Sequence, residues 1–434
     1  MALATFGATG YLIDRELFMT SIILEVVEQH AEEAAFLWGV RDAAVCMPHY
    51  SLDDLTKLDN RLDAHIDGLR IACEARPEIS KEVLSLERSG EMFAGALLAF
   101  ERGEAKRIQT VIDAVLASPE TARGLVSAFG WLPYQQAEPH IRKLLTTTCS
   151  DLRRVGIAAS AIHRQDPGPP LIAALSDRDP LLKARALRAI GQLGRLELLP
   201  SLQRNLTTEN ALCRFAAAWS AALLGDDYGV AQLQQIALLD VPYWEEAAQL
   251  AFSRLKASTA HGWLKELSQS RAFRRIAVVG VGVIGYPAFM PWLYEQMTVP
   301  PLARIAGEAF TMIAGVDLSS EDLDAERPEG YKSGPTEDPD DENVEMDPDE
   351  NLPWPHLKKI ETWWGKHRAE FRADTRYILG KPMTIEWLQK VLRIGRQRQR
   401  AVAALELAIR QPGQRLFEVR APGFRQQEIL NVES

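Results

Sequence analysis

The sequence lacks several features that would point directly to a compartment or a chemistry. Its 434 residues include only four cysteines, and these are scattered, with no C-x-x-C pair. In a chain of this length that pattern argues against a disulfide framework and a zinc site, and it favours a reducing compartment. Lys and Arg number 49 against 59 Asp and Glu. This deficit of positive charge argues against a protein that coats nucleic acid.

Long apolar runs are also scarce. Near the N-terminus, Asp14, Arg15 and Glu16 interrupt the apolar residues, so we expect no secretory signal. Residues 276–294 form a stretch of 19 without a charge, but it contains three glycines and two prolines, which do not suit a membrane helix. We therefore expect a cytoplasmic protein without a membrane span.

What the sequence does contain is a repeat of about thirty residues. A basic residue, which we call the anchor, opens an alanine-rich helical run at regular intervals, and Glu246 takes its place once. The intervals are 31, 31, 29, 32, 29 and 29 residues. The anchors are Arg123, Arg154, Arg185, Arg214, Glu246, Arg275 and Arg304. This regularity predicts stacked helical units rather than a single globular core.

Each unit also carries signals for two helices. A residue that can cap a helix precedes most anchors by four to six positions, as Ser150, Asp179 and Ser270 do. Glycine often ends the first helix, and an aliphatic residue such as Leu171 or Leu202 marks the second helix 17 positions after the anchor. Two short helices cannot bury their apolar faces alone, so neighbouring units must stack into an α-solenoid.

The phrase DRDPLLKARALRAIGQLG at 177–194 resembles the HEAT-like repeats of bacterial proteins, including the short type found in phycobilin lyases. We predict an all-α fold, an α-solenoid of HEAT-like helical hairpins between a helical N-terminal cap and a small C-terminal helical cap. The expected parts are a cap at 1–85, about seven to eight repeat units at 86–318, an acidic segment at 319–353 and a basic region at 354–434.

Within the cap we expect helices over 17–40 and from Ser51 onward, and in the basic region over 355–373 and 384–410, followed by a strand-like stretch at 416–422. The charge is divided unevenly: residues 1–318 carry −6, residues 321–350 carry −12, and residues 354–434 carry +8.

The acidic segment has almost no aliphatic side chains, so burial cannot offset its chain entropy and we predict that it is disordered or loosely ordered. A flexible polyanion can mimic nucleic acid or dock on the basic region. The acidic residues that we single out are Asp338, Asp340, Asp341, Glu342, Glu345, Asp347, Asp349 and Glu350.

The basic region combines arginines with tryptophans, a mixture that suits both protein hot spots and nucleic-acid backbones. Our candidate partner-binding residues are Trp354, Trp363, Trp364, Trp387, Arg393, Arg396, Arg398, Arg400, Arg415 and Arg425. In the alternative interpretation, the tryptophans close the C-terminal end of the solenoid and the arginines are solvated or pair with the acidic segment.

Motifs for catalysis and cofactors are missing. We find no G-x-S-x-G, H-E-x-x-H or P-loop pattern, and the eight histidines are not spaced as metal ligands. The G-x-G-x-x-G run at 280–285 lies in register with the repeat, where a βαβ unit does not fit. A glycine turn at 7–10 has only six residues before it. We predict a non-enzymatic protein with no catalytic, cofactor-binding or metal-binding residues and no cofactor.

Beyond the repeat, the whole chain resembles a family of bacterial HEAT-repeat proteins encoded in type VI secretion gene clusters. The phrases that carry this resemblance are EVVEQHAEEAAFLWGVRDAAV at 25–45, HYSLDDLTKLDNRLDAHIDGLRIA at 49–72, GRQRQRAVAALELAI at 395–409 and LFEVRAPGFRQQ at 416–427. The resemblance implies a cytoplasmic accessory role near effector, adaptor and spike-tip proteins, and it brings no catalytic residues.

Three functions stay open at this point. The favoured one is a protein–protein interaction scaffold, an accessory or adaptor that engages a secretion effector or its loading partner. The second is an immunity protein that neutralises a co-encoded toxin, with residues 321–350 as a nucleic-acid mimic. The third is a HEAT-like protein that binds or repairs nucleic acid, which the overall charge disfavours.

Overall fold

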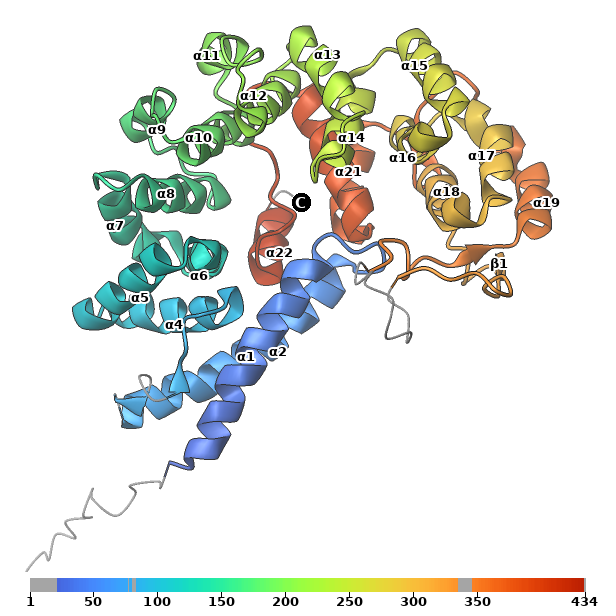
Figure 1. The fold of residues 1–434 in the computed structure, drawn as a ribbon. Helices are drawn as coiled ribbons and strands as arrows, with labels where there is room; N and C mark the ends of the chain where they lie inside the picture. Colours follow the sequence, from blue (N-terminus) through green and yellow to red (C-terminus); the bar gives the residue numbers. More distant parts are fainter. Residues whose placement is uncertain (1–21, 77, 80–82, 335–345, 433–434) are drawn as a thin grey trace, which may run out of the picture.

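The computed structural model describes residues 22–76, 78–79, 83–334 and 346–432. They form an all-α solenoid in which paired helices follow an open arc, with one row of helices on the inside and one on the outside (Figure 1). Among the described residues, no helix is both long enough and apolar enough to cross a membrane.

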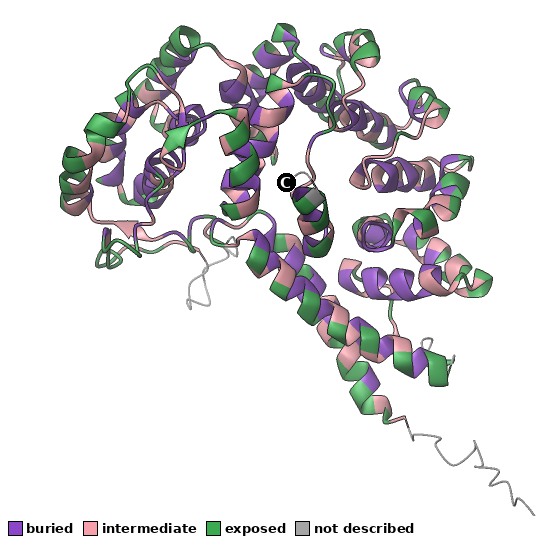
Figure 2. Ribbon diagram, turned by 180° about the vertical axis from the view of Figure 1, so that it is seen from behind, coloured by how far each residue is buried: buried purple, intermediate pink, exposed green. Residues whose placement is uncertain are grey.

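The inner row follows the predicted repeat. Its helices are α4 (Ser89–Arg102), α6 (Ala122–Trp131), α8 (Ser150–Ile162), α10 (Pro180–Leu193), α12 (Ala211–Leu223), α14 (Trp244–Arg254), α16 (Arg274–Ile284) and α18 (Pro300–Ala314). They are largely buried, as Figure 2 shows, because they pack against their neighbours in the row and against the outer helices. Helices enclosed in this way are apolar on almost every side.

The outer row consists of α5 (Ala105–Ala117), α7 (Tyr134–Leu145), α9 (Pro169–Ala174), α11 (Leu199–Gln203), α13 (Asp227–Ile236), α15 (Ala257–Gln269) and α17 (Met290–Met297). Short 3₁₀ turns join several elements: η2 (Pro119–Thr121), η3 (Leu196–Leu198), η4 (Arg271–Phe273), η5 (Pro287–Phe289) and η6 (Arg368–Glu370). The outer helices keep exposed faces toward solvent (Figure 2).

Local signals of the repeat account for its boundaries. Asp179 accepts hydrogen bonds from the backbone N–H groups of Leu181 and Leu182 and so caps α10. Gly194 and Gly285 end their helices in the left-handed conformation, with φ of 69° and 76°. The 280–285 glycine run lies in α16 and at its C-cap, which agrees with the repeat and not with a dinucleotide turn.

The N-terminal cap is a helical hairpin of α1 (Leu24–Ala44) and α2 (Leu52–Ala75), which projects from the arc in Figure 1. Ser51 begins α2 with a capping box that it forms with Asp54. The helix predicted over 17–40 begins at Leu24 and extends to Ala44, while its first residues and the glycine turn at 7–10 lie outside the described part of the chain.

The C-terminal region does more than cover the last repeat. It contains α19 (Leu357–His367), α20 (Ile385–Ile394), α21 (Gln397–Arg410) and α22 (Gly423–Val432), together with the two-stranded pairs β1 (Asp324–Ala325) with β2 (Trp354–Pro355) and β3 (Tyr377–Ile378) with β4 (Lys381–Pro382). Helices α21 and α22 lie inside the arc, where α21 contacts α12 and α14, and α22 contacts α2.

Two expectations for this region were wrong. The helix predicted over 384–410 is two helices, because the chain is extended at Gly395 between α20 and α21. The strand-like stretch is not a strand. Together with the residues before it, it forms an irregular segment of turns and coil, residues 411–422, which we call the C-terminal strap.

The predicted disorder of the acidic segment is corrected for its described residues, 319–334 and 346–353. Part of the segment pairs with β2 as strand β1. Asp347 and Asp349 are tied to arginines of the inner row. Asp338, Asp340, Asp341, Glu342 and Glu345 lie outside the described residues.

Candidate functional site

The four candidate tryptophans pack against the C-terminal end of the solenoid. The rings of Trp363 and Trp364 meet Phe310 of α18 edge to face, at centroid distances of 5.9 and 6.2 Å. The guanidinium of Arg304 lies over the Trp354 ring at 4.7 Å. Trp387 Nε1 donates a hydrogen bond of 2.7 Å to the carbonyl oxygen of Ile378. This arrangement corresponds to the alternative in which the tryptophans close the solenoid.

Most of the candidate arginines are already paired within the chain. Arg396 lies 2.7 Å from a carboxylate oxygen of Asp317, and Arg398 lies 2.7 Å from one of Glu308. Arg398 also donates to the carbonyl oxygen of Pro348 at 3.1 Å, so it holds the acidic segment against α18. These ion pairs neutralise the positive charges of Arg396 and Arg398, which are then less available to a partner.

The remaining candidate arginines differ in exposure. Arg400 is fully buried and donates to Gln397, Gln426 and a backbone carbonyl, so a partner-binding role does not fit its position. Arg393 donates to the carbonyl oxygen of Leu430, and Arg425 donates to that of Leu132. Arg415 is exposed on the C-terminal strap.

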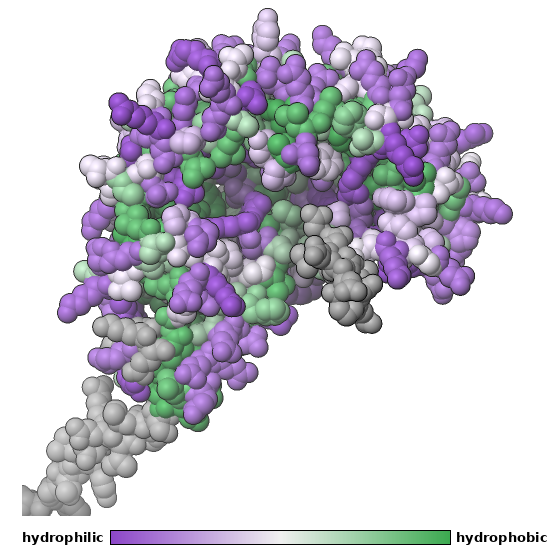
Figure 3. All heavy atoms as spheres, viewed as in Figure 1, coloured by the Kyte–Doolittle hydropathy of each residue, from purple (hydrophilic) through white to green (hydrophobic). Residues whose placement is uncertain are grey.

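A cavity of about 610 Å³ opens on the concave side of the first half of the solenoid, and we call it the arginine pocket. Residues from η2, from inner helices α6, α8, α10, α12 and α14, and from the turn before α14 line it. Four of these residues are arginines, two are glutamates, and nearly all the others are apolar. Figure 3 shows a hollow between this side of the arc and the central helices.

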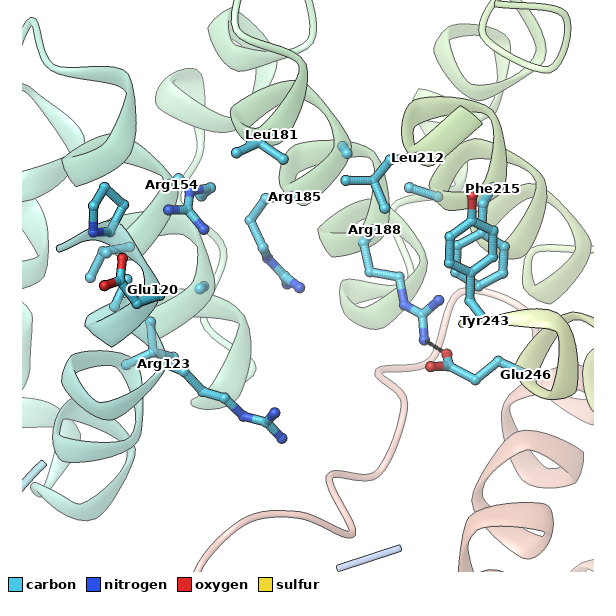
Figure 4. Close-up of a pocket in the computed structure, with 17 residues that line it drawn as sticks. Glu120, Arg123, Arg154, Leu181, Arg185, Arg188, Leu212, Phe215, Tyr243 and Glu246 are labelled. Atoms are coloured by element: carbon cyan, nitrogen blue, oxygen red, sulfur yellow. Dashed lines mark hydrogen bonds and ion pairs between the residues drawn. The ribbon is translucent and has the colours of Figure 1, made fainter. Parts of the chain in front are cut away.

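Three of the four arginines are repeat anchors: Arg123, Arg154 and Arg185. They come from successive inner helices, because the repeat places the same position on the same side of each helix. Figure 4 shows Arg123 and Arg185 extending from α6 and α10 into the space beside the strap. The sequence pattern thus indicated these residues, although not that they line a pocket.

At one end of the pocket, charge and aromatic rings are combined. Arg188 forms an ion pair of 2.5 Å with Glu246, and its guanidinium lies 3.4 Å from the centroid of the Trp219 ring. The rings of Phe215 and Tyr243 stack beside it at 4.2 Å. The positive charge of Arg188 holds the pKa of Glu246 below its usual value. At this end of the pocket, the charge of Arg188 is balanced by Glu246.

In the middle of the pocket, the positive charge of Arg185 is not balanced by a carboxylate in the part of the chain that the structure describes. Arg185 donates to the side-chain amide oxygen of Gln192, and it forms no ion pair with a carboxylate of the described residues. Burial, together with the charges of Arg188 and Arg164, lowers the pKa of Arg185 to about 9. The Nε atoms of Arg185 and Arg154 are both buried without a hydrogen-bond partner. Buried donors of this kind call for an acceptor.

At the other end, Arg123 connects the arginine pocket to a second cavity of about 160 Å³. Its side chain is 55% exposed and forms an ion pair of 2.7 Å with Asp42 of α1. Arg420 of the strap approaches the same carboxylate at 3.4 Å. The strap and the N-terminal hairpin therefore form a wall beside this end of the pocket.

The C-terminal strap crosses the inner face of α8 and α10. Arg164 forms an ion pair of 2.9 Å with Glu418, and the backbone N–H of Leu416 donates to the carbonyl oxygen of Gln192 at 3.0 Å. These contacts join segments more than 220 positions apart in the sequence, which is why no local pattern predicted them.

The last two anchors differ from those of the pocket because the acidic segment covers them. Arg275 of α16 makes a two-pronged ion pair with Asp349, at 2.5 and 2.8 Å. Arg304 of α18 pairs with Asp347. Burial opposes ionisation of Asp347, but hydrogen bonds from Ser333, from a backbone N–H and from Arg304 keep its pKa below the usual value. In the second half of the concave side, carboxylates of the same chain thus neutralise the positive charges of the anchor arginines.

Sequence reasoning predicted none of the pocket residues as site residues. It marked three of the arginines and Glu246 only as repeat anchors, and it missed Arg188, Phe215, Trp219 and Tyr243 altogether. The repeat did hold a signal for Arg188, because it lies one helical turn after an anchor. Among the described residues, no group of three or more His, Cys, Asp or Glu side chains is placed to hold a metal ion.

Comparison with known proteins supports the repeat. A family profile described as HEAT repeats matches residues 168–253, which lie within the repeat region. No curated protein matches the chain. Among solved structures, the crystal structure of an engineered protein is similar at 16% identity and a TM-score of 0.30, covering 91% of this chain and 97% of that one.

Proposed function

We propose that this protein is a non-enzymatic scaffold that binds another protein through the arginine pocket. The observation that carries the proposal is the charge imbalance in the middle of the pocket, where Arg185 lies among apolar side chains and has no carboxylate partner in the described part of the chain. An extended concave surface built from repeats suits a partner that lies along several units. Arginine and aromatic side chains are the groups that dominate protein interfaces.

The cellular setting that we propose is a bacterial type VI secretion system, with an effector or its loading partner bound in the pocket. This setting is supported by the resemblance of residues 25–45, 49–72, 395–409 and 416–427 to the family encoded in those gene clusters. We favour it over an immunity role, because the described acidic residues Asp347 and Asp349 pair with this chain's own arginines. A nucleic-acid mimic needs such charges free.

The proposal that the protein is not an enzyme rests on the chemistry of the pocket. Its described lining offers arginine, glutamate, one tyrosine and apolar side chains, but no serine, threonine, cysteine, histidine or lysine. Covalent catalysis and proton transfer near neutral pH most often use those residues. The arginines of the pocket are suited to holding a negatively charged group rather than to moving a proton.

A photo-crosslinking experiment tests the scaffold. A photoreactive amino acid is placed at Leu212, which lines the pocket and is 37% exposed, and the protein is expressed in its own host. The matched control places it at Tyr228 of outer helix α13, which is 78% exposed. We expect one defined protein adduct from the Leu212 position and none from the Tyr228 position.

Mass spectrometry of the adduct then tests the cellular setting. A secretion effector or its loading partner is the expected product. Equal adducts from both positions would contradict a pocket-mediated scaffold. A single adduct with a protein unrelated to secretion would leave the scaffold in place and reject the secretion role.

A further inference from the structure

We propose that the arginine pocket recognises an acidic peptide segment of the partner in which two carboxylates are separated by one residue. One carboxylate would bind Arg185 of α10 and the other Arg154 of α8. This inference rests on the proposed scaffold function and names the chemistry that the scaffold selects.

The chain itself contains a template for this mode of binding. Asp347-Pro348-Asp349 bridges two anchors of neighbouring repeats, with Asp347 on Arg304 and Asp349 on Arg275. The backbone N–H of Asp349 donates to a side-chain oxygen of Asp347 at 2.8 Å, which sets the two carboxylates in place. An Asp-x-Asp segment therefore has the dimensions needed to connect two successive anchor arginines.

The pocket presents the same two positions without that segment. Arg154 and Arg185 occupy the anchor position of neighbouring units and open helices that pack side by side, as Arg275 and Arg304 do. Neighbouring packed helices lie about 8–10 Å apart. The two helix pairs are thus spaced similarly, and we take one peptide geometry to serve both.

Charge and hydrogen bonding agree with this assignment. The Nε atoms of Arg154 and Arg185 are buried donors without partners, and a carboxylate can accept from a guanidinium in a two-pronged manner. The pocket arginines outnumber the pocket glutamates by four to two, and Arg188 is already paired with Glu246. Arg154 is paired with Asp151 of its own helix at 3.2 Å and Arg123 with Asp42, so Arg185 is the pocket arginine that has no carboxylate partner among the described residues.

The template also fixes the direction of the peptide. From N- to C-terminus, Asp347 and Asp349 run from a later repeat to an earlier one. The partner segment would accordingly place its first carboxylate on Arg185 and its second on Arg154. Apolar side chains before the first carboxylate would then lie over Leu212 and Phe215, which line the pocket beyond Arg185.

Fluorescence anisotropy with synthetic peptides tests the inference on the full chain. The probe is a labelled peptide of the sequence Val-Glu-Met-Asp-Pro-Asp-Glu-Asn-Leu, taken from residues 344–352. The comparison peptides have the same composition, with the two aspartates either adjacent or three residues apart. We expect the Asp-x-Asp peptide to bind at least fivefold more tightly than either rearranged peptide.

Three variants locate the binding site. We expect Arg154→Gln and Arg185→Gln each to weaken the Asp-x-Asp peptide at least tenfold. The matched control is Arg214→Gln, an anchor of the same repeat whose guanidinium donates to the carbonyl oxygens of Thr208 and Glu209 and does not line the pocket. This variant should change the affinity less than twofold. Circular dichroism confirms that each variant is folded.

Several outcomes would overturn the inference. One is equal binding of all three peptides. Another is unchanged affinity in both pocket variants. A third is loss of peptide binding in Arg275→Gln alone, since that result would show exchange at the chain's own acidic segment. Displacement of the peptide by oligo-dT at 0.15 M salt would instead indicate a nucleic-acid site. If the Leu212 crosslink forms but no peptide binds, the proposed scaffold function is retained and the proposed recognition of an Asp-x-Asp segment is rejected.

Discussion

Individual anchor residues show how one repeat position acquires different uses. Arg214 bonds to backbone carbonyls, Glu246 replaces arginine and pairs with Arg188, and Arg275 pairs with Asp349. Arg185 has only an amide partner among the described residues. An arginine at the same position of the repeat therefore stabilises the fold in one unit and can bind a partner in another. The difference depends on whether its guanidinium already has a carboxylate or carbonyl acceptor within the chain.

A partly buried histidine gives the fold a predicted dependence of stability on pH. His163, at the end of α8, has its Nε2 2.7 Å from the carbonyl oxygen of Phe129, and burial together with nearby Arg425 lowers its pKa to about 4. A histidine that is neutral in the fold stabilises it fully above the unfolded pKa of about 6.5, and the contribution is lost as the pH falls toward 4. We expect a loss of about 3 kcal/mol over this window, measured by urea unfolding.

The matched variants are His163→Gln and His261→Gln. Glutamine at 163 can still donate to Phe129 but does not titrate, so the decrease between pH 6.5 and 4 should become shallower. The exposed His261 should have no such effect when it is replaced. An unchanged pH profile in His163→Gln would refute this account.

Helix starts show what a local pattern can predict at the residue scale. Asp179 and Ser51 cap the helices that the sequence assigned to them. At α12, the side chain of Asn210 accepts a hydrogen bond from the backbone N–H of Cys213, although Thr208 two residues earlier is also of a type that can cap a helix. Both residues suit a cap, and the packing of α12 against α10 and α13 determines where the helix begins. Ser150 and Ser270, which the sequence also offered as caps, form no capping hydrogen bond, so residue type predicts only some of the caps.

Among the elements, the C-terminal strap depends on a close approach that only glycine allows. Gly194 has a φ of 69°, and a Cβ at this position would lie 2.4 Å from the carbonyl oxygen of Gly413. We expect Gly194→Ala to destabilise the fold by about 1–3 kcal/mol and to increase hydrogen exchange in residues 411–422. Gly225→Ala is the control, because it has a φ of 104° but no atom near the added Cβ.

The two variants separate backbone strain from strap contact. Both should lose stability, since both place a side chain in the left-handed region. Only Gly194→Ala should loosen the strap. Equal exchange of the strap in the two variants would show that Gly194 does not hold it.

The acidic segment gives a second prediction at this scale. Asp349 is nearly fully buried against Arg275, so Asp349→Asn removes the counter-charge of a half-buried guanidinium. We expect a loss of about 2–3 kcal/mol in urea unfolding and faster hydrogen exchange across residues 346–353. Exposed Glu350→Gln is the control and should be neutral. Unchanged exchange in Asp349→Asn would mean that the ion pair does not hold the segment.

The same elements show why part of the fold escaped prediction. The β3–β4 hairpin docks where inner helices end, with the N–H of Tyr377 donating to Gly285 at 2.8 Å and that of Leu379 donating to Met312 at 2.7 Å. These partners are far away in the sequence, so neither periodicity nor capping could indicate them. Low aliphatic content predicted a disordered acidic segment, but ion pairs with anchors order its described part. The repeat itself was predictable because its contacts are local.

At the scale of the whole molecule, the C-terminal region converts an open solenoid into a closed arrangement. The N–H of Gly423 donates to Asp59 of α2 at 2.6 Å, and Arg41 of α1 donates to the carbonyl oxygen of Ala421 at 2.8 Å. Gln397 of α21 donates to the carbonyl oxygen of Tyr50 at 2.7 Å. The N-terminal hairpin is therefore held by the chain's other end as well as by its neighbour α4.

This closure leads to a prediction about shape and cooperativity. A solenoid whose units contact only their neighbours can bend and can unfold unit by unit, whereas contacts between its ends couple distant units. Removing residues 411–434 should raise the radius of gyration in small-angle scattering and broaden the urea transition. Arg415→Gln, at an exposed position of the strap, should change neither quantity. An unchanged radius of gyration in the truncated chain would mean that the inner row alone sets the curvature of the solenoid. The strap would then line the pocket but would not hold the two ends of the solenoid together.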